Sequence, residues 1–141
     1  FPGNLRVEVT YTLENAALTI DYRAVSDKTT VVNLTNHTYF NLAGHDSGPV
    51  DGQILTLVAD RYTPCGPGNI PTGVLASVAG TPLDLRSPAR LGDRLDHPFL
   101  AGTRGFDHNF VLRSPATGPA AVLSSPETGV ALEPEVRLLG F

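Results

Sequence analysis

The alternation of apolar and polar residues is clearest near the start of the chain. From Leu5 to Leu13 every second residue is apolar, which places all the apolar side chains on one face of a β-strand. A turn at residues 14–16 separates this strand from a second alternating run, which extends from Leu18 to Ala24. Together the two runs predict a long β-hairpin.

The next alternating run has an unusual second face. It predicts a strand from Thr29 to His37, with Val32 and Leu34 on one side. The opposite side carries hydrogen-bonding groups, namely Asn33, Thr35 and His37. One face of a strand in a β-sandwich enters the core, so this polar face would look toward solvent or into a binding groove.

The rest of the chain predicts short strands joined by turns. The 14 glycines and 12 prolines recur at short intervals, a pattern typical of an all-β fold rather than of long helices. Further strands are predicted at Ile54–Val58, Phe106–Leu112, Ala120–Leu123 and Val130–Leu132, with turns at Ser114–Pro115 and Pro126–Gly129. The Pro/Gly-rich stretch Thr63–Gly80 is expected to run over the surface. We therefore expect an antiparallel β-sandwich.

Length and charge narrow the class of protein. A chain of 141 residues suits one domain, and no repeat or linker divides it. The net charge of −4, without a Lys/Arg cluster, argues against nucleic-acid or membrane-surface partners. The single cysteine, Cys65, allows no internal disulfide and favours a cytoplasmic location. Because the chain opens on Phe1 inside a turn sequence, we expect it to be an internal fragment.

The first candidate site lies where the third predicted strand ends. Asn36, His37 and Tyr39 combine an amide, an imidazole and an aromatic ring within four residues. Such a mixture suits a sugar, because aromatic faces cover C–H groups, amides pair with hydroxyls, and a histidine exchanges protons near neutral pH. The alternative is a histidine that is merely hydrogen-bonded or exposed.

A second candidate site follows a glycine turn. The sequence Gly-Phe-Asp-His-Asn-Phe, residues 105–110, again places an acid, an imidazole and an amide between aromatic residues. Asp107 could accept hydrogen bonds from sugar hydroxyls. Alternatively, Asp107 and Asn109 could satisfy the backbone of a turn.

Other chemistry-bearing residues give weaker signals. His45 and His97 are expected to be solvated, and no metal-ligand spacing is present. Cys65 has no basic neighbour that would favour a thiolate, so it is interpreted as an incidental thiol.

Six segments resemble consecutive signature segments of the galactose mutarotase (aldose 1-epimerase) family. They are FPGNL (1–5), NLTNHTYFNLAG (33–44), ADRYTP (59–64), IPTG (70–73), GTPLDLR (80–86) and GFDHNF (105–110). They occur in the order in which the family has them. The resemblance implies a large β-sandwich with an open sugar groove, and an enzyme that interconverts the α and β anomers of free aldoses without cofactor or metal.

The resemblance also assigns roles. It implies that His37 protonates the ring oxygen of a monosaccharide substrate and that Asp107 holds sugar hydroxyls, with Asn36 and Tyr39 as further substrate-binding candidates. The family's general base is a glutamate in a Glu-Pro-Gly context. Here Glu133-Pro134 is followed by Glu135, so the base is not carried over to Glu133, and the chain alone is expected to be inactive.

Two alternative functions stay open at this point. An epimerase of phosphorylated hexoses would need a cationic pocket, for which Arg61, Arg86 and Arg104 are the candidates. A non-catalytic carbohydrate-binding module would stack and hydrogen-bond a pyranose without turnover.

Overall fold

A computed structural model describes residues 1–113 and 118–135 of the chain. It contains two compact units, the first covering Phe1–Tyr39 and the second starting at Phe40, which are described separately. The predicted all-β class is confirmed, since every paired strand is antiparallel. Helix in the described residues is confined to α1 (Gly92–Leu95) and two single 3₁₀ turns. None of these helices is long and apolar enough to cross a membrane.

The first unit contains the predicted hairpin, formed by β1 (Leu5–Glu14) and β2 (Ala17–Ser26). Asn15 and Ala16 connect the strands and both have positive φ, 49° and 61°. Two central residues of this kind make a type I′ turn, whose twist matches that of the flanking strands. The turn therefore fixes the register over the whole hairpin, from Glu14 opposite Ala17 to Leu5 opposite Ser26.

The alternation of apolar and polar residues in the sequence places apolar side chains on one face of this hairpin and polar side chains on the other. Val9 pairs with Tyr22 and Tyr11 with Ile20, so apolar side chains oppose one another on one face. Polar pairs such as Glu8 with Arg23 occupy the other face. A two-stranded sheet forms a single layer and cannot bury a face by itself, and β1 is accordingly exposed along its whole length.

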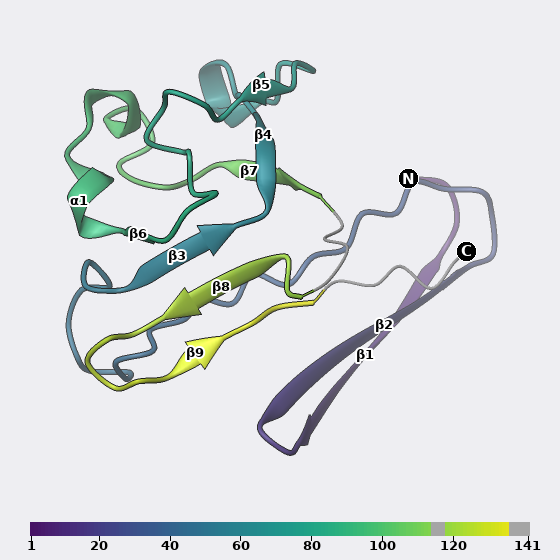
Figure 1. The fold of residues 1–141 in the computed structure, drawn as a ribbon. Coiled ribbons are helices and arrows are strands. Elements are labelled where there is room, and N and C mark those ends of the chain that lie inside the picture. Colours follow the sequence, from purple (N-terminus) through teal and green to yellow (C-terminus); the bar gives the residue numbers. More distant parts are fainter. Residues whose placement is uncertain (114–117, 136–141) are drawn as a thin grey trace. The chain divides into compact units, whose positions relative to one another are not determined.

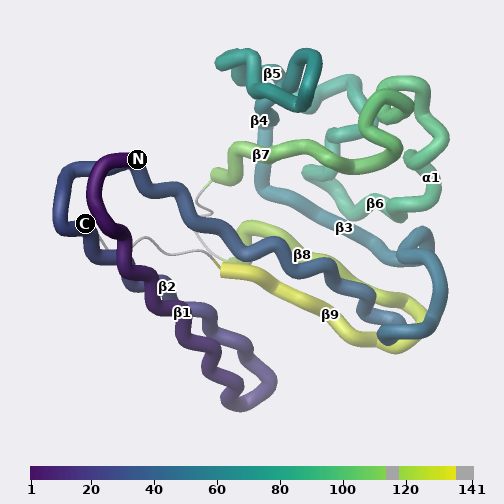
Figure 2. Tube along the Cα trace, turned by 180° about the vertical axis from the view of Figure 1, so that it is seen from behind, coloured from purple at the N-terminus to yellow at the C-terminus, as the bar shows by residue number. Residues whose placement is uncertain are grey.

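The second unit contains two small antiparallel sheets (Figure 1). One has the order β6 (Ala89–Arg90), β3 (Ile54–Leu57), β8 (Ala121–Ser124), β9 (Ala131–Leu132). The other has the order β5 (Ala76–Ser77), β4 (Ala59–Thr63), β7 (Asn109–Leu112), and the same pairings can be followed from behind in Figure 2.

Val58 joins the two sheets, because β3 ends just before it and β4 begins just after it. Its N–H donates to the carbonyl of Ala120 at 2.9 Å, and its carbonyl accepts from the N–H of Arg113 at 2.7 Å. Both backbone groups of the connecting residue are thus paired, one beside each sheet, so the chain changes sheets without losing a hydrogen bond.

The core of the second unit supports the segment that carries the second candidate site. Its buried centre consists of Tyr62, Val78, Leu83 and Leu100. Phe106 and Phe110 pack against this cluster and flank Asp107. The apolar residues on either side of the predicted site therefore anchor it to the core.

Most predicted strands are confirmed within one to three residues, but two predictions are wrong. Thr29–His37 forms no strand, because no other described segment pairs with it and alternation alone supplies no hydrogen-bond partner. The Thr63–Gly80 stretch is only partly at the surface, since it contains β5 and the fully buried Val78. Strand β4 was missed, and the predicted turn at Ser114–Pro115 lies outside the described residues.

Candidate functional site

Asn36 organises the candidate site in the first unit. Its Oδ1 accepts hydrogen bonds from the backbone N–H of Thr38 at 3.0 Å and from the Thr38 hydroxyl. Its Nδ2 donates to the Tyr11 hydroxyl at 3.5 Å, which connects the segment to β1. The bond from the Thr38 N–H to Oδ1 of Asn36 is that of an Asx turn, which holds the backbone of this segment in place.

His37 and Tyr39 lie on the same side of this turn. Their ring centroids are 5.1 Å apart, with the planes tilted by 47°. Both side chains are exposed, Tyr39 to 87%. An exposed imidazole beside an aromatic face can reach a ligand from solvent, so the local geometry suits both proton transfer and stacking on a pyranose.

The segment around Asp107, in the second unit, begins at a glycine that no other residue could easily replace. Gly105 has a φ of +126°, in a region that side chains disfavour, and its N–H donates to the Leu100 carbonyl at 3.2 Å. Asp107 is exposed, and its own N–H donates to the Gly105 carbonyl at 3.1 Å. The backbone is thus held by hydrogen bonds, while the residue that carries the carboxylate stays exposed.

His108 is a residue of interest that was not predicted as a site residue. Its ring packs against Tyr62, with centroids 5.7 Å apart, and against Phe99, at 6.0 Å. Burial lowers the pKa of His108, and the Asp107 carboxylate opposes that shift in part. The signal in the sequence was the position of His108, directly after Asp107 and near two phenylalanines.

Asn109 serves a structural purpose. Its Nδ2 donates to the Thr63 hydroxyl at 3.0 Å, and this hydroxyl donates to the Asn109 carbonyl at 3.3 Å. The two residues face each other in the pairing of β7 with β4. Asn109 therefore braces this sheet edge beside the candidate site.

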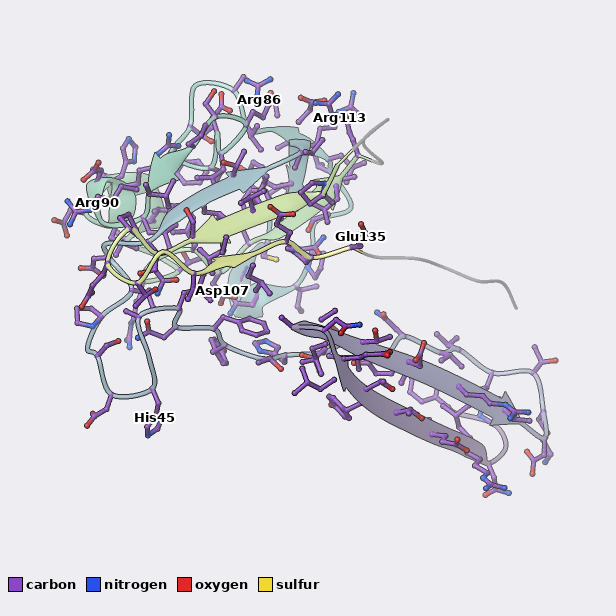
Figure 3. All side chains as sticks on the ribbon, turned by 60° about the horizontal axis from the view of Figure 1, so that its bottom comes forward. His45, Arg86, Arg90, Asp107, Arg113 and Glu135 are labelled. Carbon is purple, nitrogen blue, oxygen red and sulfur yellow. The ribbon has the colours of Figure 1, made fainter. Side chains whose placement is uncertain are left out.

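A network of ion pairs lies elsewhere on the second unit. Asp60 pairs with Arg113 at 2.8 Å and with Arg86 at 3.3 Å, while Arg86 also holds Asp84 through two hydrogen bonds. Figure 3 labels Arg86 and Arg113. The hydrogen bonds from Arg86 lower the pKa of Asp84. Because these carboxylates neutralise it, Arg86 is poorly placed to receive a phosphate.

The structure gives the other chemically reactive side chains considered in the sequence no contact that points to catalysis. His97 is exposed, as expected, and its Nδ1 also accepts from the N–H of Phe99 at 3.1 Å, which caps a 3₁₀ turn. Cys65 and His45 are exposed. Glu133 is exposed directly after β9. In residues 1–113 and 118–135, no group of three His, Cys, Asp or Glu side chains could hold a metal ion.

The predicted site residues thus fall into two sets. Asn36, His37 and Tyr39 form one local cluster in the first unit, and Asp107 with its neighbour His108 forms another in the second. The roles of these residues in binding and catalysis stay predictions.

Comparison with known proteins gives a consistent result. The family model described as aldose 1-epimerase matches residues 1–137. Galactose mutarotase of Rattus norvegicus is 50% identical over 113 residues, which are 80% of this chain and 32% of that protein. Aldose 1-epimerase of Haemophilus influenzae is 39% identical over 139 residues, 94% of this chain and 40% of that protein.

Solved structures agree with the sequence comparisons. The crystal structure of galactose 1-epimerase from Lactobacillus acidophilus NCFM superposes with a TM-score of 0.77 at 40% identity, covering 88% of this chain and 36% of that one. This similarity supports the predicted antiparallel β-sandwich class. The chain spans about a third of the length of the relatives that it matches.

Proposed function

The chain belongs to the aldose 1-epimerase family, and from this premise we propose that the protein interconverts the α and β anomers of free aldohexoses such as galactose and glucose. The observation that carries the proposal is the family match over residues 1–137, supported by relatives named galactose mutarotase at up to 50% identity. The candidate residues Asn36, His37, Tyr39 and Asp107 all lie within the matched range.

The reaction needs two coupled proton transfers. A base removes the proton of the anomeric hydroxyl while an acid protonates the ring oxygen, so that the C1–O bond to the ring breaks. The open-chain aldehyde rotates about the bond to C1, and the reverse steps close the ring with the other configuration. One acid and one base suffice, each contributing roughly 10²- to 10⁴-fold.

We assign the acid to His37. Its imidazole is exposed and lies beside the Tyr39 ring, centroids 5.1 Å apart, which offers a surface for the C–H face of the sugar. Imidazole is the usual side chain for general acid catalysis. In this proposal the Asn36 amide, oriented by Thr38, pairs with a sugar hydroxyl.

We assign substrate binding, rather than proton transfer, to Asp107. Its carboxylate is exposed on a backbone held by Gly105, so it can accept hydrogen bonds from two hydroxyls of one sugar. We do not assign the general base to Glu133, because the Glu-Pro-Glu sequence there departs from the Glu-Pro-Gly pattern of the family.

The same proposal has consequences for domain organisation, cofactors, ligand and cellular location. Both units would belong to a single sandwich domain, and the proton transfers would require neither metal nor cofactor. A monosaccharide would be the partner. The single Cys65, without a disulfide, is compatible with a cytoplasmic location.

Polarimetry on freshly dissolved α-galactose tests the proposal in the full-length protein that contains these residues. We expect the approach to anomeric equilibrium to be accelerated well above the buffer rate, and added glucose 6-phosphate to compete no better than glucose. Sugar binding without acceleration would identify a binding module instead. Strong preference for the phosphorylated sugar would identify a phosphohexose epimerase.

A further inference from the structure

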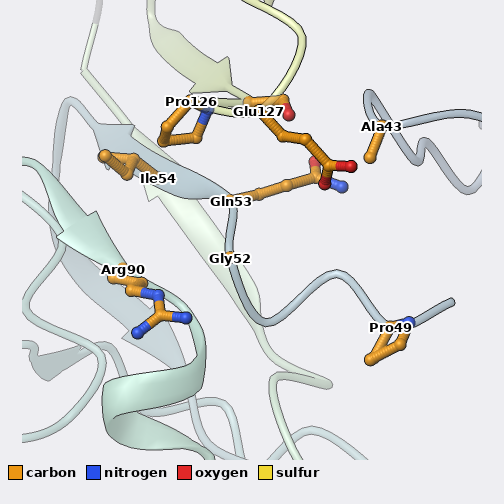
Figure 4. A pocket seen from close by; sticks show the side chains of 9 residues that line it. Ala43, Pro49, Gly52, Gln53, Ile54, Arg90, Pro126 and Glu127 are labelled. Atoms are coloured by element: carbon orange, nitrogen blue, oxygen red, sulfur yellow. The ribbon is translucent and has the colours of Figure 1, made fainter. Parts of the chain in front are cut away.

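Two polar features of the second unit are not used by the mechanism described so far. One is a pocket of about 320 Å³ whose lining includes Gln53, Arg90 and Glu127 (Figure 4). Its lining mixes apolar, positive and negative side chains, and the unpaired Oε1 of Gln53 is buried beyond the reach of a ligand, so the pocket specifies no ligand. The other is the buried Nδ1 of His108, which has no hydrogen-bond partner among the described residues. Because His108 directly follows Asp107, this second feature bears on the proposed site.

The His108 ring belongs to an aromatic cluster whose members come from three parts of the chain. Tyr62 on β4 meets it edge-on, and Phe99 in the 3₁₀ turn Pro98–Leu100 lies 6.0 Å away between centroids, with the planes tilted by 30°. Tyr62 and Phe99 also contact each other, with centroids 6.3 Å apart, so each of the three rings touches the other two. Since Tyr62 is part of the buried core, the position of the His108 ring is tied to that core.

The Asp107 carboxylate, by contrast, receives no hydrogen bond from another described residue. Its place is set through the two neighbours in the chain, because Phe106 packs against the core cluster and His108 packs against Tyr62 and Phe99. If His108 left its place, the carboxylate would be free to occupy several positions. Ordering it again on a sugar would then cost conformational entropy and weaken binding.

The packing of His108 depends on the charge of its ring. A neutral imidazole can carry its proton on Nε2 and leave only a lone pair at the buried Nδ1, whereas an imidazolium carries a proton on both nitrogens. The charged form therefore places an unpaired donor at Nδ1 in a partly desolvated position. Burial accordingly lowers the pKa of His108, which means that the packed ring is favoured in its neutral form.

Few titratable groups surround the ring on the elements that pack against it. Strand β4 carries Asp60, Arg61 and Tyr62, of which Tyr62 contacts the ring and Asp60 is held in ion pairs elsewhere. His97 precedes the 3₁₀ turn, and its own ring contacts that of Phe99, with centroids 6.5 Å apart. Within the described part of the chain, the charge that acts on His108 is the Asp107 carboxylate, which opposes the effect of burial.

We infer that His108 is a positioning residue for Asp107: the neutral ring, packed on Tyr62 and Phe99, holds the Asp107 carboxylate where it accepts hydrogen bonds from sugar hydroxyls, and protonation of the ring releases it. This rests on the proposed function, since it takes Asp107 as a sugar ligand. Sugar affinity therefore decreases in mild acid as His108 gains its proton. By linkage, a bound sugar favours the neutral ring and lowers the pH at which His108 titrates.

Binding of methyl β-D-galactopyranoside, which cannot open its ring, tests the inference in the full-length protein without turnover. We expect its Kd in the native protein to rise about tenfold from about pH 7.5 to about pH 5, as for loss of a hydrogen bond to a charged group. We also expect the NMR midpoint of His108 to fall when the galactoside is bound.

Three variants separate positioning from other effects of pH. His108→Phe keeps a ring on Tyr62 and Phe99 but cannot titrate, so its Kd should stay near the native value and change less than about twofold over the same pH range. His108→Ala removes the ring and should weaken binding at both pH values. His97→Asn is the matched control, because it removes another imidazole beside Phe99, keeps an acceptor for the Phe99 N–H, and should retain the native pH dependence.

An equal rise of Kd in His108→Phe would overturn the inference, and so would a His108 midpoint that the galactoside leaves unchanged. If His108→Ala does not fold, the comparison of the native protein with His108→Phe decides alone. Polarimetry of the native protein separates this result from the proposed function. Accelerated anomer exchange with a Kd that does not depend on pH would refute only the positioning role, whereas pH-dependent binding without acceleration would refute only the mutarotase activity. Absence of binding at both pH values would refute the positioning role whatever the activity.

Discussion

The ring of His108 packs edge-on against Tyr62, with centroids 5.7 Å apart and planes at 75°. Nδ1 of His108 is buried and has no hydrogen-bond partner among the described residues. The imidazolium form carries a proton on both ring nitrogens, so it would place an unpaired buried donor at Nδ1 and a partly desolvated charge on the ring. The packing therefore favours the neutral imidazole.

This relationship predicts the titration of His108. Burial lowers its folded-state pKa below the ordinary value of 6.5, so the folded protein binds fewer protons than the unfolded chain just below that pH. As far as His108 is concerned, the free energy of unfolding is therefore highest above about pH 6.5. It decreases as the pH falls from 6.5 toward the folded-state pKa of His108. We expect an NMR midpoint for His108 below 6.5, and lower still in Asp107→Ala, because the carboxylate favours the charged form. A midpoint above 6.5 would contradict the burial argument.

Replacement of the proposed acid should impair turnover selectively. In the full-length protein we expect His37→Asn to lower kcat by roughly 10²- to 10⁴-fold while sugar binding changes little, because asparagine can hydrogen-bond the ring oxygen but cannot protonate it. The control is His45→Asn, which alters an exposed histidine outside the proposed site. Near-normal kcat in His37→Asn would remove His37 from the chemistry.

Replacement of the proposed hydroxyl ligand should act mainly on binding. Asp107→Ala is expected to raise KM more than it lowers kcat, because a group that holds hydroxyls acts alike in the ground state and the transition state. Asp46→Ala, in an exposed loop, provides the comparison. If kcat fell while KM stayed constant, Asp107 would instead take part in proton transfer.

The backbone at Gly105 should be sensitive to any side chain. At a φ of +126°, Gly105→Ala is expected to lower the free energy of unfolding by about 1–3 kcal/mol, although the added Cβ would meet only Leu95 at 3.6 Å. Gly102→Ala, at a position without positive φ, should have a much smaller effect. Chemical denaturation of both variants measures the difference, and equal losses would show that conformation at Gly105 is not limiting.

The ion pair between Arg86 and Asp84 should respond to acid. Hydrogen bonding to Arg86 lowers the folded-state pKa of Asp84, so its stabilising contribution is present above the unfolded value of 3.8 and disappears as the pH falls through the folded value. We expect Asp84→Asn to be less stable than the native protein at pH 7, and to differ less from it near pH 2. Both residues are partly exposed, so the effect should be small and reduced by salt.

The sequence by itself determined the elements whose signal is local. Alternation from Leu5 to Leu13 and the Asn15–Ala16 turn specify the hairpin, because side-chain period and turn type together fix strand register. The motifs around His37 and Asp107 identified the family and the candidate residues, because those segments carry their chemistry in consecutive positions.

Only the tertiary structure decided which features acquire partners. The alternation in Thr29–His37 predicted a strand that does not form, because a strand requires another segment at hydrogen-bonding distance. Burial of Val78 and the packing of His108 on Tyr62 join residues far apart in the chain. Such contacts join residues that are distant in the sequence and close in space. A short stretch of sequence does not show which distant residues will pack against it.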